Sequence, residues 1–298
     1  MAITSEQVMT LRSQTGAGIM DCKGALNEAG GDISKAVEIL RKKGLAGLAK
    51  RAGRAMKEGV VVAKSSGSAC SLLEINCETD FVAKNPDVTA FAAQLAAEML
   101  TDPSLANPAE DGKAKERMQA VAMKTGENMA IRRGVVYHAA ADTAVNSYVH
   151  SDNRKGAIVE LSFSGDIASA KAELQNLARE LAMQAVAMQP RFLRREEVPA
   201  DVVAKEKEIY RAKMEKDEAD AKALAEEAGK PYKAKPAEVM EKMLEGRIKK
   251  YYQEFCLVEQ ATIRDSKQSV SQIVEALGSK LGGKVGVKRF HCFIVGVE

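Results

Sequence analysis

The residues best suited to chemistry lie in the stretch Thr79-Asp80-Phe81-Val82, which sets a carboxylate beside a bulky aromatic ring. Alternating apolar and polar residues predict a half-buried strand that ends near Cys77, and Asn85-Pro86 has the sequence of a helix start. We therefore expect residues 79–84 to form a connecting loop. Asp80 supplies a carboxylate that accepts hydrogen bonds, and Phe81 supplies a large, stiff apolar ring.

Two interpretations of Phe81 stay open on the pattern alone. Counted along the strand, Phe81 falls on the same face as Ile75 and Cys77, which favours a position in the core. Alternatively, the loop exposes Phe81 and Val82, and this apolar area awaits a partner.

The sequence holds no arrangement of residues typical of an active site. His138, His150 and His291 lie at or near the ends of predicted strands, without a serine, cysteine or acid at a diagnostic spacing. The glycine-rich segment 282–286 precedes a strand, so it offers no helix N-terminus to a phosphate. We expect a protein that is not an enzyme and that has no cofactor and no metal site.

Length and composition exclude several classes of protein. The 298 residues have room for about two domains, and 46% of them are hydrophobic, which is typical of a globular chain. Because 44 basic residues stand against 41 acidic ones, no basic excess indicates a nucleic-acid partner. Five irregularly spaced cysteines indicate a reducing compartment, and no signal peptide or membrane span is evident, so we expect a cytoplasmic protein without a membrane partner.

The N-terminal part, residues 1–53, reads as a module of three short helices within residues 4–43. A basic segment with several glycines, residues 45–54, is typical of a linker with some helical character. On the residues alone, Ile19 and Met20 fit either a small core or an apolar patch for a partner.

Residues 54–141 and 142–200 repeat one plan, in which a β-hairpin is followed by helix. In the first unit we expect strands at 60–63, 69–77 and 128–138 and helices at 86–100 and 114–125. In the second we expect strands at 145–150 and 157–164 and a helix at 167–189. The repetition indicates an internal duplication of architecture.

Residues 201–253 read as an antiparallel helical hairpin that interrupts the second unit, which resumes at residues 254–298. The outgoing helix has a thin apolar seam, and Val239, Met243 and Arg247 of the return helix are expected to face it; the seam consists of Tyr210, Met214, Asp217, Ala221, Leu224 and Ala228. The resumed part should contain a strand at 255–262, a helix at 269–281 and a strand at 285–295. The fold class is therefore α+β.

Three sequence blocks carry a resemblance to a known family. Besides Thr79-Asp80-Phe81-Val82, they are Thr15-Gly16-Ala17-Gly18-Ile19-Met20-Asp21-Cys22-Lys23 and Glu245-Gly246-Arg247-Ile248-Lys249-Lys250-Tyr251. In order and spacing they resemble bacterial elongation factor Ts, the guanine nucleotide exchange factor for elongation factor Tu. The resemblance implies an N-terminal three-helix module like the ubiquitin-associated fold, an α+β core of two subdomains, and an inserted antiparallel coiled-coil hairpin.

The resemblance also implies a partner and a set of contact residues. The partner would be elongation factor Tu, bound both with GDP and free of nucleotide, and Thr79, Asp80, Phe81 and Val82 would dislodge its magnesium ion. Arg12, Ile19 and Met20 would touch its nucleotide domain, with Ile19 departing from the usual methionine, and His150 would lie toward a different domain. A homodimer within a 2:2 complex is left open.

Two other functions compete with exchange. One is a cytoplasmic interaction scaffold that has no effect on any nucleotide. The other is an RNA-binding factor that uses the basic residues from Arg41 to Arg54.

Overall fold

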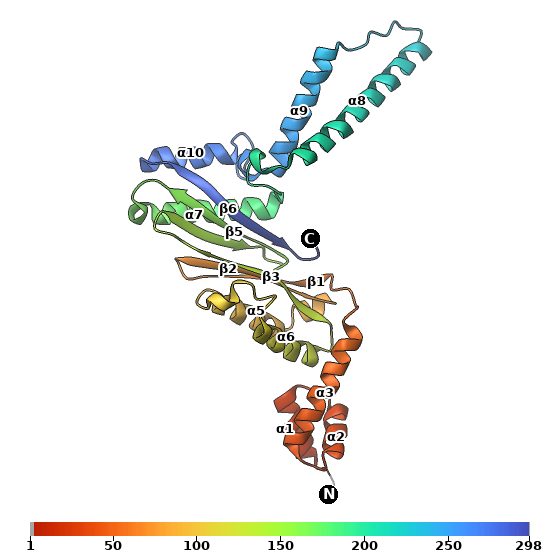
Figure 1. Cartoon of the computed structure of the whole chain (residues 1–298), viewed down its shortest axis with the longest axis vertical. Coiled ribbons are helices and arrows are strands. Elements are labelled where there is room, and N and C mark those ends of the chain that lie inside the picture. The colour runs from red at the N-terminus through yellow and green to blue at the C-terminus, as the bar shows by residue number, and fades with distance from the viewer. Residues whose placement is uncertain (1–2, 298) are drawn as a thin grey trace.

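The structure, a computed structural model, describes residues 3–297, except for the side chains of Leu45, Leu48 and Ala49. It has an α+β architecture in which two three-stranded antiparallel sheets lie stacked in the middle of an elongated molecule. Helices cover the outer face of each sheet, a helical module lies at the N-terminal end, and two long helices project from the opposite end (Figure 1).

Each sheet is built from a short hairpin and one later strand. The first sheet has the order β1-β2-β3, with β1 (Glu58–Ser65), β2 (Ala69–Cys77) and β3 (Met129–His138). The second has the order β4-β5-β6, with β4 (Thr143–Val149), β5 (Lys155–Phe163) and β6 (Val285–Ile294). The strands predicted in both units are thus confirmed, with ends that differ by at most two residues.

Two helices cover each sheet. Packed on the first are α5 (Pro86–Glu98) and α6 (Gly112–Thr125), and packed on the second are α7 (Ile167–Met188) and α10 (Val270–Leu281). Both helix starts are capped. Asn85, as expected, accepts a hydrogen bond from the Asp87 amide, and Ser269 forms a capping box with Gln272. Short 3-10 helices lie at Pro103–Ala106, Arg195–Glu197 and Leu257–Glu259.

The inner faces of the two sheets pack on each other, which places β2 in the core on both sides. Leu73 and Ile75 pack toward α5 and α6, whereas Leu72 packs toward the second sheet, with Val145 and Ile158. The strand predicted to end at Cys77 is confirmed, but the prediction that it is half-buried is wrong, because every residue of β2 is buried. The alternation suggested that the polar residue Glu74 faces solvent, but Glu74 is buried in the layer between the two sheets.

Each sheet contains a glutamate–arginine pair at an equivalent position, and these two pairs connect the sheets. In the first, Glu74 of the central strand accepts from the Arg133 Nε (2.7 Å), and in the second Glu160 accepts from the Arg289 Nε (2.5 Å). A β-bulge lies next to each pair. Each arginine then stacks on an aromatic ring of the other sheet: the Arg133 Cζ lies 4.6 Å from the Phe293 centroid, and the Arg289 Cζ lies 4.0 Å from the Tyr137 centroid. This crosswise arrangement supports the predicted duplication.

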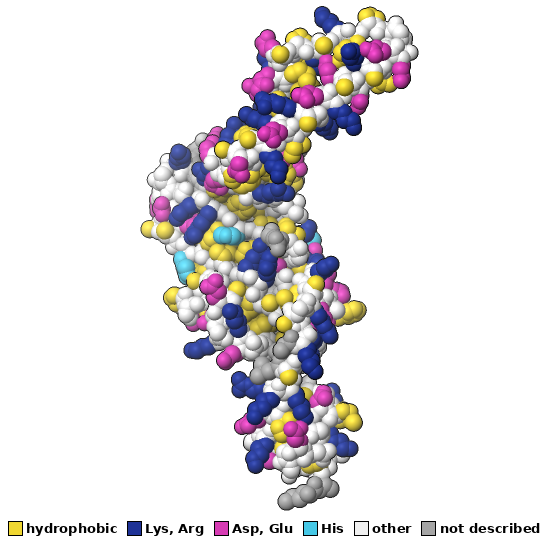
Figure 2. All heavy atoms as spheres, turned by 45° about the vertical axis from the view of Figure 1, so that its right-hand side comes forward, with side chains coloured by type: hydrophobic (Ala, Val, Ile, Leu, Met, Phe, Trp, Pro, Cys, Tyr) yellow, Lys and Arg dark blue, Asp and Glu magenta, His cyan; other side chains and the backbone are white. Residues whose placement is uncertain are grey.

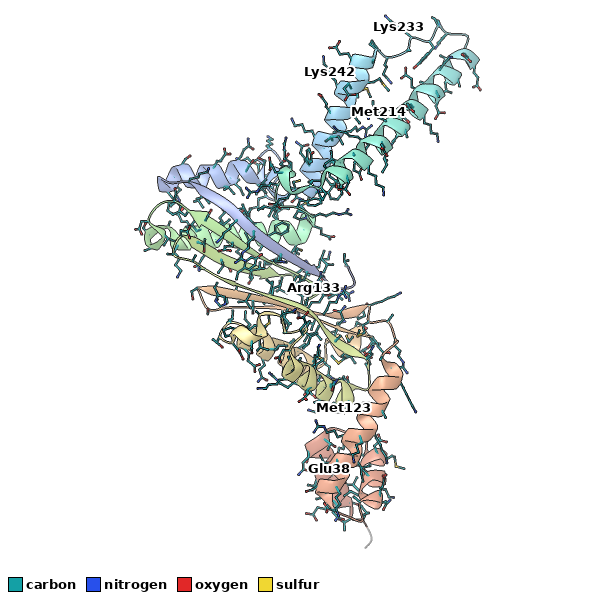
Figure 3. The ribbon with its side chains drawn as sticks, viewed as in Figure 1. Glu38, Met123, Arg133, Met214, Lys233 and Lys242 are labelled. Carbon is teal, nitrogen blue, oxygen red and sulfur yellow. The ribbon has the colours of Figure 1, made fainter. Side chains whose placement is uncertain are left out.

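The N-terminal module consists of α1 (Ser5–Thr15), α2 (Ile19–Glu28) and α3 (Ile33–Arg51) around a small core that includes Leu11, Cys22 and Leu26. Gly16 ends α1 in the left-handed conformation, with φ of 68°. The segment expected to be a linker is largely helical, since α3 continues to Arg51. There α3 lies against α6, because the missing side chain of Gly44 leaves room for Met123 (Figure 3).

The two projecting helices are α8 (Ala200–Glu227) and α9 (Ala237–Phe255). The predicted facing residues of α9 are wrong, since Val239, Met243 and Arg247 are exposed; Leu244, Ile248 and Tyr251 are buried instead. On α8, Met214 is buried as expected, but Asp217 and Leu224 are exposed. Both errors place the apolar contact about one position away from its true register.

The strand predicted at 255–262 is wrong as well. Helix α9 runs to Phe255, and the following residues bond in an irregular path to the backbone of Phe192 and Leu193. Within residues 3–297, no helix has the length and apolar character needed to cross a membrane. In the same range, no three His, Cys, Asp or Glu side chains lie close enough together to hold a metal ion.

Candidate functional site

The segment after β2 is not the loop that the sequence predicts but a single helical turn, α4 (Asp80–Ala83). Thr79 caps this turn, with its hydroxyl oxygen accepting from the Val82 amide (3.4 Å) and its carbonyl accepting from the Ala83 amide (3.2 Å). Because α5 starts at Pro86, the chain passes from strand to turn to helix with few residues free to move.

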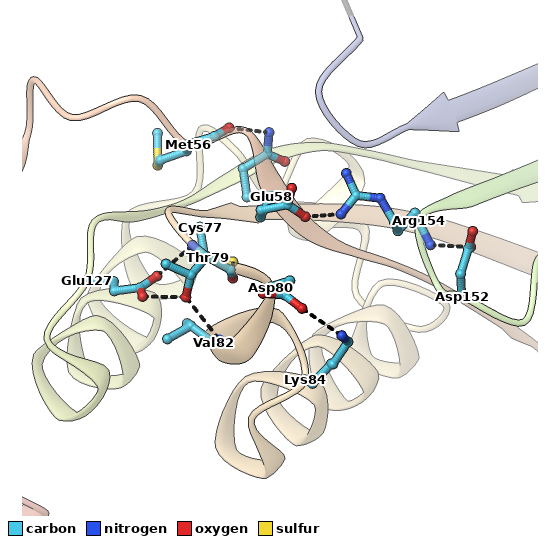
Figure 4. A network of polar contacts seen from close by, with 11 residues as sticks. Met56, Glu58, Cys77, Thr79, Asp80, Val82, Lys84, Glu127, Asp152 and Arg154 are labelled. Atoms are coloured by element: carbon cyan, nitrogen blue, oxygen red, sulfur yellow. Dashed lines mark hydrogen bonds and ion pairs between the residues drawn. The ribbon is translucent and has the colours of Figure 1, made fainter.

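Glu127, which follows α6, holds the turn in place through hydrogen bonds. One carboxylate oxygen of Glu127 accepts from the backbone amides of Glu78 (3.1 Å) and Thr79 (3.0 Å), and the other accepts from the Thr79 hydroxyl (2.6 Å), as Figure 4 shows in part. Three donors thus hold one carboxylate, which fixes the position of Thr79 relative to the first sheet.

The segment that ends β2 and the segment that follows α6 bond to each other in both directions, since Glu78 in turn accepts a hydrogen bond. The Glu78 carboxylate accepts from the Asn128 amide (2.6 Å) and pairs with Arg54 (3.2 Å). The bond from the Asn128 amide holds the pKa of the Glu78 carboxyl below its usual value, with the Arg54 bond adding to it. Beside it, burial raises the pKa of the Cys77 thiol to about 11, so Cys77 is a neutral thiol at neutral pH.

Asp80 begins α4 and remains at the surface. Its carboxylate lies 2.7 Å from the Lys84 Nζ, one helical turn along the chain. The hydrogen bond from Lys84 holds the pKa of the Asp80 carboxyl below its usual value, so the group is ionised at neutral pH. The pair is exposed and can exchange Lys84 for another partner at little cost.

Phe81 is 83% exposed, whereas Ala83 is buried and Val82 is partly buried against the first sheet and α5. The interpretation of Phe81 as a core residue is therefore wrong. It assumed that the alternation of β2 continues to residue 81, but the strand ends at Cys77 and the turn of α4 rotates Phe81 outward. The structure presents an aromatic ring on a firmly held backbone.

A second exposed surface lies on the N-terminal module. Arg12 of α1 is exposed, and Ile19 and Met20 at the start of α2 are 48% and 77% exposed. The alternative interpretation of these two residues as core is wrong, because Leu11, Cys22 and Leu26 fill that role.

His150 lies just after β4, at the turn that leads to β5. Its Nδ1 is 3.1 Å from the Asp152 Oδ1. It lines a small cavity of about 200 Å³ together with Tyr148, Met183 and Ile263. Apart from His150 and Lys155, the lining of this cavity is largely apolar.

The structure thus places the predicted residues on three surfaces: the turn at 79–82, the module patch of Arg12, Ile19 and Met20, and the surroundings of His150. Within the described range, no hydrogen bond or ion pair joins any two of these surfaces directly. The sequence interpretation missed Glu127 and Asn128, although Gly126 marks the helix end that delivers them.

Comparison with known proteins bears on the whole chain. A family model described as Elongation factor TS matches residues 78–297. A protein named Elongation factor Ts from Trichlorobacter lovleyi is 40% identical over 312 residues, covering 99% of this chain and 93% of its own length. Relatives of the same name from Syntrophotalea carbinolica and Nitratidesulfovibrio vulgaris are 42% and 36% identical, covering 99% and 100% of this chain and 94% and 97% of their own lengths.

Proposed function

The chain belongs to the elongation factor Ts family of translation elongation factors, and from this premise we propose that it is a guanine nucleotide exchange factor for elongation factor Tu. It binds the partner's GDP complex, disturbs the magnesium site and promotes release of GDP. Exchange makes and breaks no covalent bond, which agrees with the expectation that the protein is not an enzyme.

The observation that carries the proposal is the exposed ring of Phe81 on the braced turn α4. A free protein gains nothing by exposing a large apolar side chain, whereas an interface gains most from aromatic anchors that fill a pocket. Because Glu127 and the Thr79 cap already fix the backbone, little conformational entropy is lost when the ring inserts.

We call the inserted Phe81 ring and the turn that carries it the wedge, and Asp80 adds a negative charge to it. Its carboxylate is ionised and only loosely held by Lys84, so it can compete for hydrogen-bond donors of the partner. Magnesium demands near-ideal octahedral geometry, and a small displacement of its surroundings costs much of the affinity for GDP. Thr79, Asp80, Phe81 and Val82 together form the element that dislodges the metal.

The thermodynamic requirement is reciprocity. A factor that binds nucleotide-free elongation factor Tu more tightly than the GDP form must weaken GDP binding by the same ratio. Each tenfold of that ratio corresponds to about 1.4 kcal/mol of coupling. Contacts made only in the nucleotide-free complex, such as an inserted ring, are of the kind that supplies it.

The other surfaces provide docking area in this proposal. Arg12, Ile19 and Met20 contact the partner's nucleotide domain from a module of the ubiquitin-associated type at residues 1–53. His150 faces a different domain of the partner, from the second of two core subdomains, residues 54–141 and 142–200 with 254–298. The coiled-coil hairpin, residues 201–253, stands apart from exchange, and a homodimer within a 2:2 complex is compatible with this division.

Release of fluorescent GDP from purified elongation factor Tu, with and without this protein, tests the proposal. We expect catalytic amounts to speed release, and Phe81→Ala to lose most of that effect. Leu224→Ala is the matched control, because Leu224 is also a large exposed side chain (66%) but lies on α8. Complex formation without faster release would make the protein an interaction scaffold and end the proposal.

A further inference from the structure

Strand β6 is the outermost strand of the second sheet, so one of its edges faces away from β5. The Val295 amide donates to the Arg154 carbonyl across this pair (2.9 Å), and bonded residues alternate along an antiparallel ladder. The backbone groups of Phe290 and Cys292 therefore point outward, to the free edge.

Both ends of this edge are occupied. The Val287 carbonyl accepts from Arg194 (2.8 Å), and the Ile294 carbonyl accepts from the Val297 amide (3.1 Å) and from Arg133 (3.4 Å). Between them, no partner within residues 3–297 bonds the outward amides and carbonyls of Phe290 and Cys292. The free stretch is thus long enough for one short strand, and β-edges in natural proteins are seldom left open without a reason.

A groove of about 870 Å³ runs beside this edge, and apolar and polar side chains share its wall about equally. The wall comes from β6, from the segment after α7 and from the end of α9; it includes Met188, Pro190, Phe192, Phe255, Phe290 and Ile294. Met188 is 45% exposed there. In Figure 2, apolar side chains gather beneath the base of the two long helices.

The groove also offers a cation. The Arg191 Cζ lies 4.7 Å from the centroid of Phe255, while the nearby Glu197 and Glu259 pair with Arg194 and Arg195. Stacked guanidinium groups keep their in-plane donors available for a carboxylate. Arg133, Lys288 and Arg289 line the groove as well, but they pair with the buried carboxylates of Glu74 and Glu160. Among the described residues, Arg191 is therefore the groove cation that no ion pair engages.

We propose that the free edge of β6 and this groove bind an extended segment of a partner protein, which adds a fourth strand to the second sheet. The segment bonds to Phe290 and Cys292, seats an apolar side chain against Phe192 and Phe255, and presents a carboxylate to Arg191. Main-chain bonds give such strand addition its affinity, and the alternate side chains give it specificity. The site lies apart from Phe81, and it therefore adds a second interface to the proposed exchange surface.

The test uses the full chain, labelled with nitrogen-15, and two blocked hexapeptides of alternating valine and threonine. Each carries one phenylalanine, followed two positions later by glutamate in the first peptide and by lysine in the second. We expect the largest amide shifts at Phe290 and Cys292, and about tenfold tighter binding of the glutamate peptide, as for one charge-assisted hydrogen bond.

Three variants locate the binding. Cys292→Pro removes an outward amide and should abolish binding, since an edge strand tolerates proline. Arg191→Ala should keep the fold but erase the preference for glutamate, and Arg264→Ala, a surface arginine paired with Glu180, should change neither. All three should leave GDP release unchanged, so failure here is separate from failure of the exchange proposal.

Several results would overturn the inference. They are the absence of amide shifts along β6, equal affinities of the two peptides, or a glutamate preference that survives Arg191→Ala. Shifts at Phe290 and Cys292 that grow with protein concentration alone, with a dimer in sedimentation, would assign the edge to a second copy of this chain instead.

Discussion

At the scale of single residues, the turn at 79–82 has a firmly held backbone and exposed side chains, and different residues provide the two properties. Ala83 and the Glu127 bonds anchor the backbone, while the ring of Phe81 and the carboxylate of Asp80 remain in solvent. The anchoring residues and the presenting residues can therefore be changed independently, which makes their roles separable by experiment.

Phe81→Ala should change the free energy of unfolding by about 1 kcal/mol or less, as at surface sites generally. A buried phenylalanine would instead cost roughly 3–5 kcal/mol. The same variant should lose most of its GDP-release activity, and Asp80→Asn should spare stability while slowing release. Thermal unfolding and nucleotide release on both variants measure these effects; a badly destabilised Phe81→Ala that stays active when folded would exclude the wedge.

Glu127→Ala should destabilise the protein by about 1–3 kcal/mol, because it leaves the amides of Glu78 and Thr79 and the Thr79 hydroxyl without their acceptor. Exchange should also slow, since α4 no longer holds Phe81 in place. Glu116→Ala, an exposed change on α6, serves as the control. Full activity in a destabilised Glu127→Ala would show that the wedge needs no brace.

The two buried glutamates of the sheet layer give a prediction about pH. Burial raises the pKa of Glu74, and Arg133 offsets it only in part. For Glu160 burial also acts upward, but hydrogen bonds from Arg289, Thr143 and Lys288 outweigh it and lower the pKa. The two carboxylates occupy equivalent places, so each is the control for the other.

Glu160 stabilises the fold above the carboxyl pKa of an unfolded chain, about 4.3, and this contribution disappears as pH falls through its lower folded-state pKa. Glu74 behaves oppositely: its raised pKa gives a contribution that is present at low pH and is lost as pH rises through the folded-state value. Glu160→Gln should therefore cost about 1–3 kcal/mol at pH 7, and less in acid, whereas Glu74→Gln should cost less at pH 7. Denaturant unfolding at several pH values compares them; equal costs at pH 7 would contradict the assignment.

At the scale of elements, the sequence predicts what depends on neighbours along the chain. Strands and helices of both core units follow from alternation, caps and turns, which are local signals. The hairpin register does not, since an apolar stripe one position over is equally helical, and Val239 and Met243 looked as suitable as Leu244 and Ile248. The strand predicted at 255–262 failed because tertiary bonds to residues 192–193 shape that segment.

The same locality limits the prediction of the site. The types of residue at 79–82 drew attention to the turn, but its geometry depends on Glu127, which lies 48 residues away from Thr79. No pattern within the strand could indicate that partner. The direction of Phe81 therefore became evident only from the fold.

The hairpin gives a prediction that the register makes specific. Glu218 bonds to Lys235, and Arg211 pairs with Glu241. These pairs show which residues of α8 and α9 lie opposite each other, so both helices can be shortened to the same height. Replacing residues 207–246 with a four-residue turn keeps the cluster at the base, around Val203 and Tyr251. We expect a folded protein with unchanged GDP release; a soluble but inactive product would place the hairpin in the exchange surface.

At the scale of the whole molecule, the N-terminal module touches the body mainly where α3 lies along α6. It has its own core and holds the exposed Ile19 and Met20. Deleting residues 1–53 should weaken the complex with elongation factor Tu but leave release measurable at saturating protein. Titration calorimetry with nucleotide-free elongation factor Tu measures the loss, and an unchanged affinity would mean that the module serves another partner.

The path of the chain through the two sheets has one more consequence. Within residues 3–297, no strand of either sheet is exchanged with the other, and along the chain the sheets are connected only through residues 139–142. The halves meet through a layer in which each arginine stacks on the other half's aromatic ring. A gene cut at this joint should yield two polypeptides that recognise each other and reassemble when coexpressed, with the layer acting as an adhesive between separate molecules. The two halves would then behave as two subunits that recognise each other through this layer, and in the intact chain a short segment connects them.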